Sequence, residues 1–268
     1  MKTYSKYLVK RFLPKGILLK IKDKYHEMKG RKNEQEFRGD AVFCPCCKKK
    51  FSKFMDFSST IHNNSERYLN TYKNTVCPSC FSMPRQRIIC YYLNMNIQSV
   101  PQNNILIFGA EFSIKKWFDM NGFHYQTADL FDRSADFKVD IQNIPFPDES
   151  WKLILCNHIL EHVPDFILAL KELKRVLSKD GFLVITVPID RNFATVYEDA
   201  GIVSAKDRIK HFGQADHLRI FGNDFDKILN DCGFLVEVVN GDMLPTQIGG
   251  VIGPVNYDDN RVYICRRR

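Results

Sequence analysis

The 268-residue sequence lacks an apolar run long enough to cross a membrane, which takes about 20 residues in a helix. Lysines interrupt the apolar stretches near the N-terminus before the core of a signal peptide, about 7 residues, can form. The sequence also lacks the G-x-G-x-x-G loop that cradles the pyrophosphate of a dinucleotide. We therefore expect a cytoplasmic protein with neither a membrane-spanning helix nor a dinucleotide site.

The nine cysteines are an odd number, which does not fit a framework of paired disulfides. In a reducing compartment, clustered cysteines more often bind metal. The sequence contains two C-x2-C pairs separated by 29 residues, namely Cys44 with Cys47 and Cys77 with Cys80. Two such turns can close a tetrahedron of thiolates around one ion. We therefore expect a structural Zn2+ in a zinc-ribbon-like module over residues 41–83.

The other cysteines are not expected to bind the ion. Cys46 lies inside the first turn, and His62 remains an alternative ligand in the polar stretch between the two pairs. The remaining four stand in apolar surroundings and are expected to pack as small hydrophobic residues: Cys90, Cys156, Cys232 and Cys265.

The net charge of +8 is concentrated at the N-terminus. Residues 1–33 contain 11 Lys and Arg against 2 Asp and Glu, so they carry +9 and the rest of the chain carries −1. This basic arm has helical spacing, and the polar residues 30–40 are typical of a linker. Two interpretations stay open: the arm packs one face on the body, or it lies peripherally on the anionic inner face of a membrane.

Residues 84–268 show the alternation of strands and helices that is typical of an α/β domain. Apolar runs such as NILIFG, WKLILCN and FLVITVPI alternate with amphipathic stretches. In DFILALKELKRVLS, Asp165 suits the N-cap and Lys179-Asp180-Gly181 the end of the helix. Alternating βα units with apolar strands predict a parallel sheet that helices cover on both faces.

Ligands of an open α/β sheet bind beyond the carboxyl ends of its strands. Asp129 follows Gly109, at the end of the first such strand, by 20 residues. That is the spacing of a carboxylate that binds ribose hydroxyls in nucleotide-binding βαβ units. Without a pyrophosphate loop, a nucleoside ligand without phosphates fits better. The alternative that Asp129 only caps its strand stays open.

The segment LCNHILEHVPD, followed by ALKELKRVLSKDGFLVITVP, resembles the core of the class I S-adenosylmethionine-dependent methyltransferases of the type 11 kind. The CPCC and CPSC pairs, PRQR, IFGAE and HFGQADHLRIFG extend the likeness to a bacterial subset with a four-cysteine module. The resemblance implies a Rossmann-like domain with a mostly parallel seven-stranded sheet, and S-adenosylmethionine as cofactor. Because that subset often accompanies surface-polysaccharide genes, it also implies a small-molecule or glycan acceptor, with O-methylation favoured.

The resemblance assigns a role to residues at successive strand ends. The cofactor-binding positions are Gly109 for the methionine end, Asp129 for the ribose, Asp140 and Ile141 for the adenine, and Asn157 near the methyl group. The chain departs from the family at Ile107, where an acid is usual, and at Glu111, where a second glycine is usual. We expect Glu111 to take over the ammonium of the cofactor; the alternative is a lapsed site.

Transfer to a hydroxyl also needs a base, and histidines are the candidates. We expect His158, at a strand end, and His217, in an insertion over residues 190–222 that is placed to form a substrate lid. His162 and His211 are further candidates, and Asp216 with Arg219 could contact a polar sugar.

Two other functions stay open. The basic and aromatic residues of CPCCKKKFSKF and PRQR could hold RNA for an RNA methyltransferase. The near-neutral body disfavours a nucleic-acid partner. The altered loop from Gly109 to Glu111 would also suit a non-catalytic scaffold.

Overall fold

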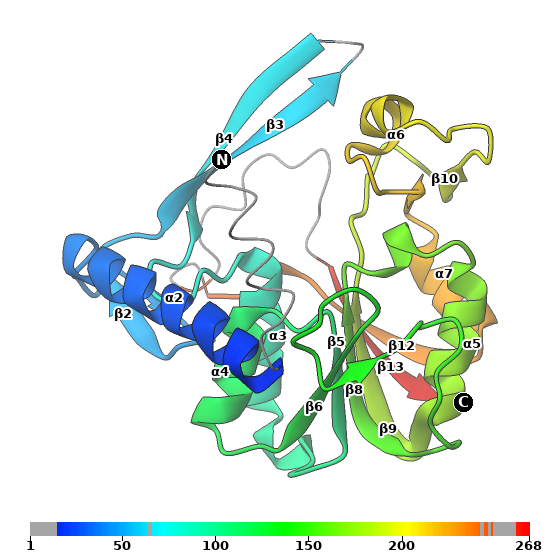
Figure 1. Ribbon diagram of the computed structural model, residues 1–268, viewed down its shortest axis with the longest axis horizontal. Coiled ribbons are helices and arrows are strands. Elements are labelled where there is room, and N and C mark those ends of the chain that lie inside the picture. The colour runs from blue at the N-terminus through cyan, green and yellow to red at the C-terminus, as the bar shows by residue number, and fades with distance from the viewer. Residues whose placement is uncertain (1–14, 64–65, 242–243, 246–247, 249–260) are drawn as a thin grey trace.

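The computed structural model describes residues 15–63, 66–241, 244, 245, 248 and 261–268, and Figure 1 shows their arrangement. A long N-terminal helix and two small antiparallel sheets precede an α/β domain built on a larger sheet. None of the helices in the described residues is long and apolar enough to span a bilayer.

The large sheet has seven strands in the order β12-β13-β9-β8-β5-β6-β7. Strand β13 pairs antiparallel with β9 and β12, and the other neighbouring pairs are parallel. The predicted mostly parallel seven-stranded sheet is therefore confirmed. Its strands are β5 (Ile105–Phe108), β6 (Tyr125–Asp129), β7 (Phe137–Lys138), β8 (Trp151–Asn157), β9 (Leu177–Thr186), β12 (Phe234–Val239) and β13 (Val262–Arg267).

Alternate side chains of the strands enter two hydrophobic layers, one on each face of the sheet. Ile105 and Ile107 of β5 pack with helices α3 and α4, whereas Leu106 and Phe108 pack with α5 and α7. Because both faces are covered, β5 is a continuous apolar run with every residue buried. The helices of this domain are α3 (Pro84–Met95), η1 (Ile97–Ser99), α4 (Phe112–Met120), η2 (Leu160–His162), α5 (Phe166–Val176) and α7 (Phe225–Asp231).

Helix α5 begins as predicted and ends earlier than predicted. Asp165 caps it by accepting a hydrogen bond of 2.8 Å from the backbone N–H of Leu168. The helix ends at Val176 and β9 begins at the next residue, so the predicted end at residues 179–181 is wrong. Gly181 serves the strand instead, because a Cβ there would lie 2.6 Å from the carbonyl oxygen of Lys152. The glycine lets β9 approach β8 closely.

Helix α2 (Lys15–Glu36) continues through most of the stretch that was expected to be a linker. Gly30 lies inside this helix and is buried. A Cβ at this position would collide with the carbonyl oxygen of Ser79, next to the second cysteine pair. The glycine therefore lets the helix pack closely on the cysteine module, and the linker interpretation of residues 30–36 is wrong.

Helix α2 also packs on the α/β domain. This agrees with the interpretation that one face of the arm packs on the body. Its contacts are the ion pairs Lys22–Asp132 (2.8 Å) and Asp23–Lys115 (2.9 Å), and His26 stacked on Phe112 with ring centroids 4.8 Å apart. Residues 1–14, on which the membrane interpretation also depends, lie outside the described residues.

The residues between α2 and α3 form two antiparallel pairs, β1 (Val42–Cys44) with β2 (Lys49–Phe51) and β3 (Met55–Asn63) with β4 (Glu66–Val76). The second pair is a long hairpin that projects from the body (Figure 1). Phe51 and Phe54 pack in the same hydrophobic layer as α3 and α4. The cysteine module thus shares its core with the α/β domain.

The insertion over residues 190–222 contains β10 (Tyr197–Glu198), α6 (Ala205–Phe212) and β11 (Arg219–Ile220), and β10 pairs antiparallel with β11. It follows β9 and stands on the same side of the molecule as the long hairpin (Figure 1). Helix α6 contacts β3. The predicted lid therefore lies beyond the carboxyl edge of the sheet.

Candidate functional site

Gly109 ends β5 and directs the chain into α4. Its φ of +56° lies in the left-handed region that residues with a Cβ rarely adopt. A Cβ would also lie 3.2 Å from Cδ1 of Ile159. The backbone N–H of Gly109 donates to the carbonyl of Ala128 at 3.0 Å, which ties this loop to β6. Backbone geometry therefore favours glycine at this position, and a larger residue would have to displace the side chain of Ile159.

Glu111 follows in the same loop, and one of its carboxylate oxygens is held from outside the sheet. Oε1 accepts hydrogen bonds from Arg85 Nη2, at 2.9 Å, and from Gln86 Nε2. Both donors lie in the first turn of α3, directly after the second cysteine pair. Oε2 is buried and has no hydrogen-bond partner among the described residues. The loop therefore offers a fixed carboxylate with one unsatisfied oxygen.

Asp129 ends β6 beside this loop, and the two oxygens of its carboxylate have different surroundings. Oδ1 accepts the backbone N–H groups of Phe131 and Asp132 at 2.7 Å each, so it caps the turn that follows the strand. Within the described part of the chain, no hydrogen bond reaches Oδ2. The alternative that Asp129 caps its strand is thus correct for Oδ1, and Oδ2 can still accept a hydrogen bond from a ligand.

Asp140 and Ile141 lie beyond β7. Ile141 is buried in the layer under α5. The carboxylate of Asp140 turns back on its own loop, where Oδ1 accepts the backbone N–H of Gln142 at 2.9 Å. The side chain of Gln142 in turn accepts the N–H of Asp165, at 2.8 Å. This loop is therefore anchored to the start of α5.

Asn157 and His158 stand at the end of β8. Asn157 is buried and accepts a hydrogen bond from the hydroxyl of Thr186 at 3.3 Å. His158 has φ of +51°, and its backbone N–H donates to the carbonyl of Thr186 at 2.9 Å. Its Nδ1 lies 3.2 Å from Oε1 of Glu161. Its Nε2 is buried without a hydrogen-bond partner among the described residues.

Glu161 is a site residue that the sequence argument missed. It lies in η2, between the two predicted histidines His158 and His162, and its side chain is fully buried. Burial alone would raise the pKa of Glu161, but the adjacent imidazole of His158 outweighs burial and lowers the pKa. A glutamate inside the apolar LEHV stretch was the available signal, because such an acid is rarely buried without a role.

The lid places His217 beside Glu161 and His162. His217 is buried, and its ring lies 4.8 Å from that of His162. Burial lowers the pKa of His217. His211 lies apart within the lid, 2.8 Å from the hydroxyl of Tyr197. Asp216, in contrast, is exposed beside His162.

Arg219 was expected to contact a sugar, but the structure uses its guanidinium internally. It donates to the backbone carbonyls of Leu160, Val163 and Pro164 and pairs with Glu198 at 2.8 Å. Arg219 is buried in this position. It holds the lid on η2, so its expected role in substrate contact is wrong.

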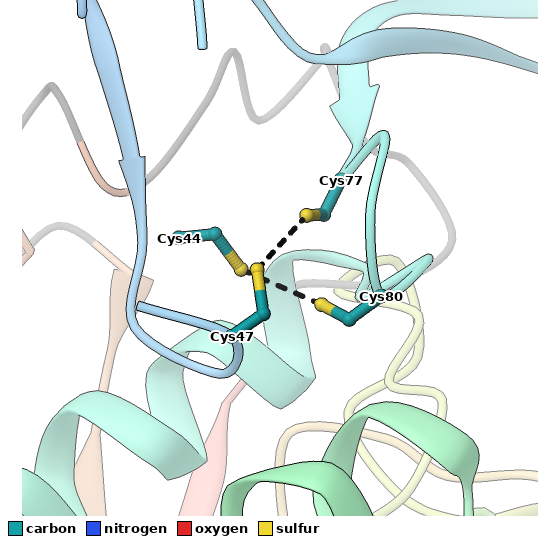
Figure 2. A group of neighbouring side chains, drawn as sticks. All are labelled: Cys44, Cys47, Cys77 and Cys80. Carbon is teal, nitrogen blue, oxygen red and sulfur yellow. Dashed lines mark hydrogen bonds between the residues drawn. The ribbon is translucent and has the colours of Figure 1, made fainter. Parts of the chain in front are cut away.

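The two predicted cysteine pairs converge, as Figure 2 shows. The Sγ atoms of Cys44 and Cys80 lie 3.6 Å apart, and those of Cys47 and Cys77 lie 3.7 Å apart. Thiolates around one Zn2+, with bonds of about 2.3 Å, are separated by about 3.8 Å in a regular tetrahedron. All four side chains are buried. The donor set therefore fits a tetrahedral ion.

Cys46 lies beside this cluster but outside the four converging thiols. Its Sγ donates to the carbonyl oxygen of Gln86 at 3.4 Å. His62 lies in β3 of the long hairpin, where its backbone is opposite that of Arg67 in β4. Arg87 of the PRQR stretch is buried and donates to the carbonyls of Thr75 and Ser82. Its guanidinium supports the chain around the cluster, so it does not face solvent as a phosphate contact would.

Residues 123–185 match the family described as a methyltransferase domain. The chain is similar to 27-O-demethylrifamycin SV methyltransferase of Amycolatopsis mediterranei, with 24% identity over 141 residues, 53% of this chain and 50% of that protein. It is also similar to demethylmenaquinone methyltransferase of Staphylococcus haemolyticus, with 34% identity over 64 residues, 22% of this chain and 27% of that protein. The matches span half or less of these relatives.

The chain is also similar to solved structures. An S-adenosylmethionine-dependent methyltransferase from Mesorhizobium loti is similar over 68% of this chain and 98% of that chain, with a TM-score of 0.46 and 16% identity. The α/β part of the chain has the mostly parallel seven-stranded sheet of a Rossmann-like fold, and the residues that match the methyltransferase domain, 123–185, include β6, β7, β8 and most of β9.

Proposed function

We propose that the chain is an S-adenosylmethionine-dependent methyltransferase that methylates a hydroxyl group of a small molecule or glycan. One observation carries the proposal. Two neighbouring loops at the carboxyl edge of the sheet each keep one carboxylate oxygen without a partner among the described residues, Oε2 of Glu111 and Oδ2 of Asp129. A buried acceptor without a partner, such as Oε2 of Glu111, costs free energy unless a ligand satisfies it.

The free oxygens suit the two polar ends of this cofactor. Oδ2 of Asp129 can accept hydrogen bonds from the ribose hydroxyls, while Oδ1 caps the turn after β6. Oε2 of Glu111 can accept a hydrogen bond from the ammonium group of the cofactor, because Arg85 and Gln86 hold Oε1 in place. Asp140, Ile141 and Asn157 would complete the adenine and methyl ends. The fit supports a carboxylate at position 111 as the replacement for the missing acid at Ile107.

When bound, the cofactor supplies an electrophilic methyl group, so much of the rate enhancement comes from alignment of the acceptor. His158 is placed to assist a hydroxyl acceptor. Glu161 faces its Nδ1, and this orients the ring so that Nε2 keeps a lone pair for the proton that the hydroxyl releases. Similarity to relatives named for a rifamycin and for a menaquinone precursor favours a small organic acceptor, and the first of these names specifies an oxygen.

We also propose one structural Zn2+, bound by Cys44, Cys47, Cys77 and Cys80. The convergence of four buried thiols at tetrahedral spacing supports it. The ion would fix the chain between β4 and α3, from which Arg85 and Gln86 reach Glu111. The module would then stabilise the cofactor loop and need not contact RNA.

Transfer of a labelled methyl group tests the activity. Full-length protein is incubated with methyl-labelled cofactor and a panel of glycans, small hydroxyl compounds, quinols and total RNA. We expect label in a hydroxyl compound and at least tenfold less label with His158→Gln, at unchanged cofactor affinity. Label in RNA alone would contradict the acceptor class. Absence of cofactor binding by the wild-type protein would reject the enzyme and leave a scaffold.

The arm is the one segment for which we propose a membrane contact, because residues 1–14 carry four basic residues and no acid. Each basic residue near an anionic surface contributes about 1 kcal/mol. Sedimentation with phosphatidylserine vesicles, compared between full-length protein and a variant that begins at Lys15, measures this contribution. Equal sedimentation of the two proteins would reject it.

A further inference from the structure

Three side chains with metal-binding chemistry meet at the end of β8, apart from the cysteine cluster. Glu161 and His162 come from η2, and His217 comes from the lid. One donor atom of each residue lies within 4.8 Å of the other two. Glu161 and His217 are buried, whereas His162 is partly exposed.

The hydrogen bonds of the two histidines leave the same ring nitrogen free in each. Nδ1 of His162 lies 3.2 Å from the carbonyl oxygen of Asp216, and Nδ1 of His217 lies 3.1 Å from that of Phe212. A carbonyl oxygen only accepts, so Nδ1 carries a proton in both rings. In the neutral imidazole, each Nε2 then presents a lone pair. Metal-binding histidines are usually held in this way, with the second ring nitrogen donating to a carbonyl or carboxylate.

The carboxylate of Glu161 lacks the partners that burial normally demands. Neither oxygen has a hydrogen bond of ordinary geometry within the described residues. The ionisable side chains that pair with it among the described residues are His158, with Nδ1 at 3.2 Å from Oε1, and His162, with Nε2 at 3.9 Å from the same oxygen. A buried carboxylate is costly unless it is paired or coordinates a metal. No lysine or arginine in the described part of the chain forms an ion pair with Glu161.

We propose that Glu161, His162 and His217 form a second metal site, which binds a divalent transition-metal ion such as Mn2+, Fe2+, Co2+ or Zn2+. Two imidazoles and one carboxylate on one side of an ion are a common donor set for these metals and leave coordination positions open. Bonds of about 2.1 Å allow donor atoms to be at most about 4.2 Å apart, so the donors need to approach by roughly half an ångström. The lid can supply this small movement.

The location suggests what the ion does. It would lie beside Asn157 and His158, where the proposed function places the acceptor, and an open position could hold the acceptor oxygen. It would also join the lid to the sheet edge through His217. This role rests on the proposed function, whereas binding of the ion does not.

Cobalt titration tests the site, because Co2+ bound to thiolates gives a strong charge-transfer absorption that Co2+ bound to nitrogen and oxygen lacks. Full-length protein that retains zinc at the cysteines is titrated with Co2+ and followed by visible absorption and equilibrium dialysis. We expect one further ion per chain, without the thiolate band. Glu161→Gln and His162→Ala should each weaken its binding at least tenfold, and His124→Ala, an exposed histidine elsewhere, should not.

Two results would overturn the proposal. One is the absence of a cobalt ion beyond the cysteine site in wild-type protein. The other is unchanged affinity in both Glu161→Gln and His162→Ala, with circular dichroism showing that the variants are folded. If the wild-type protein binds no second ion and the variants melt at a lower temperature than the wild-type protein, the three residues only hold the lid in place. Calorimetry with S-adenosylhomocysteine on the same samples separates this outcome from failure of the proposed function.

Discussion

The cysteine module and the carboxyl edge of the sheet differ in how completely their polar groups are satisfied. In the module, four thiols face one another at the spacing of a closed tetrahedron, and Arg87 donates to the surrounding carbonyls. At the edge, oxygens of Glu111 and Glu161 and a nitrogen of His158 are buried without partners among the described residues. A closed donor set is typical of a structural metal, and unsatisfied groups indicate where ligands bind.

The two regions are also joined. Cys80 is followed within a few residues by Arg85 and Gln86, which hold the carboxylate of Glu111. A change in the module can therefore reach the loop of Glu111 through the first turn of α3. The comparison predicts that module variants lose stability first, whereas edge variants lose ligand affinity without losing stability.

The largest effect is expected from Cys77→Ser. Binding of a structural Zn2+ contributes on the order of 10 kcal/mol to such modules, so the variant should lose the ion and several kcal/mol of unfolding free energy. Metal analysis and thermal denaturation measure both. Cys46→Ser is the matched control, because Cys46 is equally buried but lies outside the cluster. Equal metal content in the two variants would contradict the assignment of the ligands.

A smaller effect, confined to the edge, is expected from Glu111→Gln. The variant keeps the shape of the side chain but loses the charge that would face the cofactor's ammonium. A hydrogen bond to a charged group contributes about 1.5–3 kcal/mol, which corresponds to a loss of affinity of about tenfold to a hundredfold. Calorimetry with S-adenosylhomocysteine measures it. Unchanged affinity would mean that another group binds the ammonium, and unchanged zinc content is expected in either case.

Sequence patterns predicted the parts of this molecule whose residues lie close together along the chain. The C-x2-C turns, the cap at Asp165 and the strand ends at Gly109, Asp129 and Asn157 are local features, and the structure places them as expected. The zinc itself and the roles of these residues in binding remain predictions.

Sequence patterns did not predict contacts between distant segments. Glu161 and His217 meet because the lid is fastened to η2 by Arg219 and by the backbone N–H of Leu218, which donates to the carbonyl of Glu161 at 2.8 Å. Gly30 looked like the start of a linker, but it lies inside α2 because the cysteine module packs against that helix. In both cases the deciding interaction is tertiary, and local propensity carries no information about it.

The smallest effect is expected from Arg85→Met, which tests the link between the two regions. The ion pair with Glu111 is only partly buried, so its loss should cost about 1 kcal/mol, or about fivefold in affinity for S-adenosylhomocysteine. Zinc content should stay the same. Lys48→Met, which removes a cation that directly follows the first cysteine turn and donates to Asn121, serves as the control. Equal affinities of the two variants would show that the regions act independently.

The central claim is that the carboxyl edge of the sheet binds S-adenosylmethionine through Asp129. Isothermal titration of S-adenosylhomocysteine into wild-type protein, Asp129→Ala and Asp180→Asn tests it most directly, since Asp180 is an exposed acid near the start of β9, at the opposite edge. We predict binding to wild-type protein and Asp180→Asn, and affinity about tenfold to a thousandfold lower for Asp129→Ala, because charge-assisted hydrogen bonds of about 1.5–3 kcal/mol each are lost. No heat from wild-type protein at millimolar ligand, or equal affinity in all three proteins, would contradict it.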